Sequence, residues 1–101
     1  MNDRVHGYLG LALRAGKALV GEAIIKVWSV RPIYLLLIAV DATSHTQNKL
    51  AARARDEKVT VLHAYRKAEL GRALGFDEVS SVAISDKGLA QQIIDVIKED
   101  L

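Results

Sequence analysis

The stretch "IYLLLIAV" (residues 33–40) is the longest apolar run in the chain. A strand with one face in water alternates apolar and polar residues, whereas a strand covered on both faces is apolar throughout. The run therefore predicts a central strand with a layer of helices on each side. Its eight residues are far fewer than the roughly 20 that a membrane-spanning helix needs.

Short strand-like segments and helical patterns alternate on both sides of this run. We expect strands at 17–20, 59–64 and 78–85, and helices before residue 16, over 21–30, over 44–58, over 67–74 and from 86 to the end. This alternation predicts a layered α/β domain. Because no linker, repeat or low-complexity tract interrupts it, residues 1–101 are predicted to form a single domain.

The predicted helices carry typical capping residues. Asn2 or Asp3 can cap the first helix, and Asp86 can cap the last. Ser44 and Gln47 have the spacing of a capping box. Residues that favour a helix stop follow three of the helices: Gly16, Pro32 and Gly75.

The composition is that of an ordinary globular protein, with 50% hydrophobic and 26% charged residues. The absence of cysteine excludes disulfides and thiolate metal sites. The start of the chain, "MNDRVHGYLG", lacks the apolar core of a signal peptide. We therefore expect a cytoplasmic protein without membrane contact.

The net charge of +2 hides an uneven distribution. Residues 1–75 hold 12 Lys or Arg against 6 Asp or Glu, whereas residues 76–101 hold 2 against 6. Such unevenness is typical of a surface that faces a polyanion. Two solvated faces of opposite charge explain it equally well.

The sequence offers little for catalysis or metal binding. His6, His45 and His63 lie on separate predicted elements without metal-ligand spacing. Ser44 and His45 follow Asp41, which suggests a catalytic triad. However, adjacent residues at a helix start point in different directions, so Ser44 and His45 are not expected to act together. No glycine-rich phosphate loop is present. We expect no cofactor, no metal and no enzymatic activity.

The stretch "ALVGEAIIK" (18–26) puts Glu22 directly after Gly21, at the predicted start of a helix. The first N–H groups of a helix lack partners within it, so they can bind a ligand, and a glycine lets that ligand approach. Lys17 and Lys26 are expected to flank this helix start. Alternatively, Glu22 only complements the helix dipole.

The order of four segments resembles a known superfamily. "LGLALRAGKALVGEAIIK", "IYLLLIAVDAT", "KAELGRALG" and "SSVAISDKG" follow one another as in the ribosomal protein L7Ae/L30e superfamily, and within it the bacterial YlxQ branch. The resemblance covers roughly residues 6–95. It implies a three-layer α/β/α sandwich around a four-stranded mixed sheet.

The resemblance also implies binding to kink-turn RNA, a bent helix with tandem sheared G·A pairs. The family's G-x-N-E-x-x-K motif reads the sheared guanines, and its glutamate corresponds to Glu22. Such edges are accessible only because the RNA is distorted. The motif's first glycine, asparagine and lysine are here Leu19, Gly21 and Ile25.

Two loops complete the family's binding face. One follows the central strand and includes Asp41. The other is "GFDEVSS" (75–81), in which Val79 and Ser80 suit packing on a splayed nucleotide, whereas Asp77 and Glu78 would face phosphate. The residues expected to bind RNA are Lys17, Gly21, Glu22, Lys26, Asp41, Val79 and Ser80.

The resulting expectation is a monomeric, non-enzymatic protein that binds structured RNA, alone or on the ribosome, with a ribosomal or other protein as a further possible partner. A protein-interaction module on the same fold, which uses its basic surface to meet an acidic partner, remains the alternative.

Overall fold

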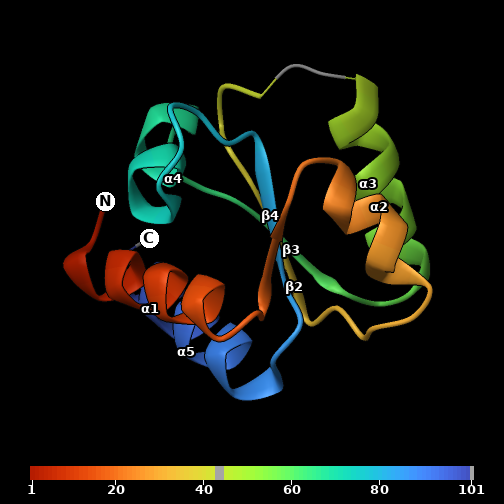
Figure 1. Cartoon of the computed structure of the whole chain (residues 1–101), viewed down its shortest axis with the longest axis horizontal. Coiled ribbons are helices and arrows are strands. Elements are labelled where there is room, and N and C mark those ends of the chain that lie inside the picture. Colours follow the sequence, from red (N-terminus) through yellow and green to blue (C-terminus); the bar gives the residue numbers. More distant parts are fainter. Residues whose placement is uncertain (43–44, 101) are drawn as a thin grey trace.

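The computed structural model describes residues 1–42 and 45–100, which form a four-stranded sheet between two layers of helices (Figure 1). The helices are α1 (Asp3–Arg14), α2 (Glu22–Trp28), α3 (His45–Asp56), α4 (Lys67–Leu74) and α5 (Lys87–Glu99). The strands are β1 (Ala18–Val20), β2 (Leu35–Ile38), β3 (Thr60–His63) and β4 (Ser81–Ile84). Every predicted element is present.

The sheet is mixed, with strand order β1-β4-β2-β3. Strand β2 is parallel to β3 and antiparallel to β4, and β1 is antiparallel to β4. Both central strands are buried at all four positions. The regular part of β2 is shorter than the apolar run, but Tyr34 N–H and Ala39 N–H still donate to β4 and to the residue before it.

The side chains of β2 alternate between two apolar cores. Leu35 and Leu37 pack with α1, α4 and α5, whereas Leu36 and Ile38 pack with α2 and α3. Figure 1 shows these two layers of helices on opposite faces of the sheet. Each such buried side chain contributes about 1.5–3 kcal/mol. The three-layer α/β/α sandwich with a central strand buried on both faces is therefore confirmed.

The predicted caps are confirmed where the structure describes them. The side-chain oxygen of Asn2 accepts from the N–H of Arg4 at 2.8 Å, and Asp86 Oδ1 accepts from the N–H of Leu89 at 2.8 Å. Gly16 and Gly75 have φ of +72° and +83°, the left-handed conformation that ends a helix. The predicted capping box of Ser44 with Gln47 involves Ser44, which lies outside the described residues.

The connections between elements gather at two ends of the sheet. The upper end in Figure 1 carries residues 21–22, 39–42, 64–66 and 75–80. The lower end carries residues 15–17, 29–34, 57–59 and 85–87. Within the described ranges, none of the helices is long and apolar enough to cross a membrane.

Candidate nucleic-acid interface

The start of α2 lies at the upper end, where Gly21 joins β1 to the helix. Its backbone has φ +59° and ψ −135°, a combination that is essentially restricted to glycine. Chain neighbours aside, no described heavy atom lies within 4 Å of the place where a Cβ would be. Backbone conformation, not crowding, therefore requires glycine here, and the approach to α2 is open.

Glu22 is the first residue of α2 and is exposed, as is Lys26 in the last turn. The two are four residues apart and so share one side of the helix. Ile25, at the position of the family's lysine, is 52% exposed. This side of α2 thus offers a carboxylate, an ammonium group and an apolar surface to a ligand.

Lys17 does not lie beside the start of α2, so that part of the prediction is wrong. The three residues of β1 separate Lys17 from Gly21, which puts their Cα atoms about 13 Å apart at roughly 3.3 Å per residue. The carbonyl of Lys17 accepts instead from the N–H of Ser85, at the lower end. Lys17 and Gly21 are close in sequence but not in space, because β1 runs between them from the lower to the upper end of the sheet.

Asp41 is engaged within the protein. Its Oδ1 accepts from the N–H of Lys67 at 2.8 Å, and its Oδ2 is 3.7 Å from the Arg66 guanidinium. The hydrogen bond from Lys67 is the main reason that the pKa of Asp41 lies below its ordinary value of 3.8. Asp41 therefore ties the end of β2 to the start of α4, a structural role that the sequence did not indicate.

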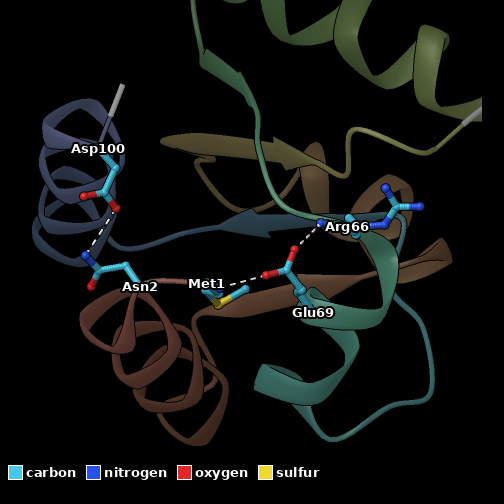
Figure 2. A network of polar contacts seen from close by, with 5 residues as sticks. All are labelled: Met1, Asn2, Arg66, Glu69 and Asp100. Carbon is cyan, nitrogen blue, oxygen red and sulfur yellow. Dashed lines mark hydrogen bonds and ion pairs between the residues drawn. The ribbon is translucent and has the colours of Figure 1, made fainter.

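The start of α4 is anchored a second time through Glu69. Its carboxylate accepts from the N-terminal ammonium of Met1 at 2.7 Å and from the N–H of Arg66 at 3.0 Å (Figure 2). These contacts, that from Met1 first, lower the pKa of Glu69 below 4.5. The side-chain amide of Asn2 donates a hydrogen bond to the carboxylate of Asp100 (Figure 2). Helices α1, α4 and α5 are thereby held together at this corner.

A hollow of about 300 Å³, here called the upper hollow, opens between the β1–α2 junction and the 75–80 loop. Its lining includes Val20, Gly21, Gln47, Phe76, Val79 and Ser80. The structure therefore brings Gly21 together with Val79 and Ser80, as the site prediction requires, although almost 60 residues separate them in sequence.

Sequence reasoning did not single out Phe76 or Gln47, which also line the upper hollow. Phe76, the single phenylalanine, is 49% exposed at its edge; an aromatic residue directly after the helix-ending Gly75 was the available signal. Gln47 was interpreted only as a cap. Its Oε1 is buried and has no hydrogen-bond partner among the described residues.

The loop that carries Phe76 is fixed to α4. The N–H of Phe76 donates to the carbonyl of Gly71 at 2.8 Å, and the N–H of Val79 donates to the carbonyl of Lys67 at 3.0 Å. A Cβ on Gly71 would lie only 2.7 Å from the carbonyl oxygens of Phe76 and Asp77. The absence of a side chain at Gly71 therefore allows the loop to lie directly on the helix.

Charge at the upper end is mostly negative. Three exposed carboxylates, those of Glu22, Asp77 and Glu78, lie in its connections. The exposed Arg66 is a positively charged residue in the same connections. Such a surface does not attract phosphate strongly. It suits hydrogen bonding and stacking with bases better than contact with an RNA backbone.

The residues considered for metal binding or catalysis lie on different elements. His6 lies on α1, His45 begins α3 and His63 ends β3. No three His, Cys, Asp or Glu side chains among the described residues could hold a metal ion. The Asp41 carboxylate, which a catalytic triad would need, binds the start of α4.

Comparisons with known proteins agree with this architecture. The chain is 34% identical over 90 residues to the RNA-binding protein YlxQ of Bacillus subtilis, covering 88% of this chain and 90% of that protein. A solved structure of a protein of unknown function from Bacillus halodurans superposes with a TM-score of 0.86 at 28% identity, over 96% of this chain and 99% of the other. The Giardia lamblia 15.5kD RNA binding protein shares the fold, with a TM-score of 0.71 at 17% identity over 95% and 83% of the two chains.

The family model of the "Ribosomal protein L7Ae/L30e/S12e/Gadd45 family" matches residues 3–94, from the start of α1 into α5. Together with the YlxQ relative, this match places the chain in the YlxQ branch of the L7Ae/L30e/S12e/Gadd45 family.

Proposed function

We propose that the protein binds structured RNA at the upper end of the sheet and catalyses no reaction. The observation that carries the proposal is the upper hollow, a space of about 300 Å³ that Gly21 and Val79 line, with the exposed ring of Phe76 at its edge. An exposed aromatic ring beside a hollow suits an unstacked base of RNA. The names of two similar proteins, one from Bacillus subtilis and one from Giardia lamblia, support RNA as the ligand.

The RNA we propose is a kink-turn or a similarly distorted helix. Glu22 would accept from the N–H groups of a guanine edge, and the bare start of α2 at Gly21 would allow the base to approach. Lys26 would neutralise a phosphate, while Phe76 and Ser80 would pack on a splayed nucleotide. Val79, which is 6% exposed, would offer it only an edge. Asp41 would act indirectly, by holding α4 and its loop in place.

A distinctive consequence is that base contacts outweigh phosphate contacts at this end. The family's lysine position is the apolar Ile25, and Asp77 and Glu78 repel phosphate. We further propose that the protein acts in the cytoplasm as a monomer, free or on the ribosome. The alternative, an interaction module for an acidic protein, predicts co-purifying proteins that survive ribonuclease treatment of a lysate.

The proposal is tested by titrating the protein with a labelled kink-turn RNA and with an unkinked duplex of the same composition. The kink-turn RNA should bind more tightly, and Phe76→Ala should reduce that affinity by about tenfold, since stacking on one base is worth about 1–3 kcal/mol. Phe76→Tyr, which keeps the ring, is the matched control. Equal affinity for both RNAs would contradict kink-turn recognition. The absence of any RNA binding would contradict the proposed function.

A further inference from the structure

Residues at the lower end of the sheet form a row across all four strands. Ala18 pairs with Ile84, Ile84 with Leu35, and Leu35 with Thr60. One residue further out, the row therefore reads Lys17, Ser85, Tyr34 and Val59. Backbone hydrogen bonds fix three of its members: the N–H of Ser85 donates to the carbonyl of Lys17 at 2.8 Å, and that of Tyr34 donates to the carbonyl of Ile84 at 2.9 Å.

Each of the four connections at this end brings a basic residue. They are Lys17 before β1, Arg31 before β2, Lys58 before β3 and Lys87 at the start of α5. Arg31 donates to the carbonyl of Gly16 at 2.8 Å, so its guanidinium lies at the backbone of the residue before Lys17. Lys58 and Lys87 are exposed.

The two carboxylates of these connections are already engaged. Asp86 Oδ1 accepts from the N–H of Leu89 at 2.8 Å. Glu57 accepts from Arg53 at 2.8 Å and from the indole N–H of Trp28 at 3.2 Å. With four basic residues against these two carboxylates, the connections of the lower end are more positive than those of the upper end, where Glu22, Asp77 and Glu78 are exposed.

A second hollow, of about 370 Å³, opens at the lower end and is here called the lower hollow. Tyr34, 37% exposed, lies in its wall together with Lys58 and Lys87. Thr60 and Gln91 add polar groups, and Ile94 adds apolar surface. Glu57 also lines the hollow, with its carboxylate paired to Arg53. An aromatic ring and two lysines around one hollow match what proteins use for single-stranded nucleic acid, where rings stack on bases and cations follow the backbone.

We infer that the lower end is a second RNA contact, which binds a single-stranded segment through its phosphates and one base. Lys17, Lys58 and Lys87 neutralise phosphates, and Tyr34 stacks on a base in the lower hollow. Three strand spacings of about 4.8 Å separate the outer members of the row, which is enough to follow a short stretch of backbone. The inference rests on the proposed function, because it takes RNA as the ligand, but it does not use the start of α2.

The test uses the full chain and a labelled single-stranded oligouridine RNA, titrated at several salt concentrations. The variant is Lys58→Asn with Lys87→Ala; asparagine is chosen because Lys58 has φ +59°, a conformation that asparagine tolerates. The matched control, Arg72→Ala with Lys98→Ala, removes the same charge from exposed positions on α4 and α5. Melting curves check that every variant folds.

The lower-end variant should bind oligouridine more weakly, and its slope of log affinity against log salt should be about 1.4 shallower, since each phosphate contact on a single strand contributes about 0.7. Tyr34→Leu should weaken binding about tenfold, whereas Tyr34→Phe should retain it. The control pair should leave the slope nearly unchanged. Equal losses in both pairs would mean diffuse charge and would overturn the inference.

Two further outcomes separate this inference from the proposed function. If kink-turn RNA binds in a Glu22-dependent manner but oligouridine binding ignores Lys58, Lys87 and Tyr34, only the second contact is wrong. If the protein binds neither RNA, both proposals fail. Competition by polyglutamate as effective as that by oligouridine, with no effect of Tyr34→Leu, would make the lower end a surface for acidic protein and would overturn the RNA contact.

Discussion

At the scale of single residues, Glu22 is the position where two physical roles compete. A carboxylate in the first turn of a helix stabilises it by about 0.3–1 kcal/mol through the dipole, and this role needs no ligand. Yet Glu22 is exposed beside the open approach at Gly21 and shares a side of α2 with Lys26. The two roles predict opposite effects of removing the charge on RNA affinity.

Glu22→Ala should weaken binding of a kink-turn RNA if the carboxylate reads a guanine edge. The loss of a charged hydrogen bond costs about 1.5–3 kcal/mol, which exceeds the relief of repulsion from phosphate. Glu22→Gln should also bind more weakly, because it presents an N–H donor where guanine donates. Titration at fixed salt measures both. Tighter binding by Glu22→Ala would leave this residue with the dipole role alone.

At the scale of elements, the geometry of the upper hollow depends on how α4 carries its following loop. Gly71 lies in the middle of α4, and the carbonyl oxygens of Phe76 and Asp77 would be 2.7 Å from a Cβ there. The backbone of that loop, unlike a long side chain, cannot move aside without breaking the hydrogen bonds of Phe76 and Val79 to α4. A single methyl group at Gly71 would therefore displace the loop that forms part of the proposed RNA surface.

Gly71→Ala should destabilise the fold by about 1–3 kcal/mol, as overpacking in a close contact does, and should weaken RNA binding more than that loss alone explains. Denaturant unfolding and RNA titration on the same preparation measure the two effects. Gly7→Ala is the control, because no described heavy atom outside its own helix and chain neighbours lies within 4 Å of a Cβ at Gly7. Unchanged RNA affinity in folded Gly71→Ala would show that loop position does not matter.

The elements themselves could be predicted from the sequence, whereas the contacts between them could not. An apolar run, capping residues and glycine stops report on local physics, and they gave β2, the Asn2 and Asp86 caps and the ends of α1 and α4 correctly. The engagement of Asp41 with Lys67 spans 26 residues and has no local pattern. The same applies to the position of Lys17, which depends on the direction in which β1 crosses the sheet.

At the scale of the whole molecule, the uneven charge of the sequence becomes a difference between two ends of one sheet. The basic N-terminal part supplies Lys17, Arg31 and Lys58 to the lower end, whereas the acidic C-terminal part supplies Asp77 and Glu78 to the upper end. Arg53 belongs to neither, because its guanidinium lies 4.9 Å over the Trp28 ring and bonds to Glu57. Glu22, at the upper end, and Lys87, at the lower end, are exceptions to this division between the two parts of the sequence.

The stability of the whole molecule should depend on pH through the two carboxylates that anchor α4. The pKa values of Asp41 and Glu69 lie below their ordinary values in the folded protein because N–H and ammonium groups donate to them. A lowered folded-state pKa means that the stabilisation is complete above the ordinary values, 3.8 and 4.5, and is lost as the pH falls through the lowered ones. The free energy of unfolding should therefore decrease in acid, below about pH 4.5.

Asp41→Asn tests this linkage, because asparagine keeps an acceptor for Lys67 N–H but has no charge to lose. The variant should be less stable than the parent at neutral pH, and the difference should shrink as the pH falls, since the parent loses the contribution that the variant never had. Urea unfolding across the acid range measures it. Asp77→Asn, at an exposed position of the 75–80 loop, controls for the loss of one negative charge. If the two variants give the same stability at every pH, the tie between β2 and α4 does not stabilise the fold.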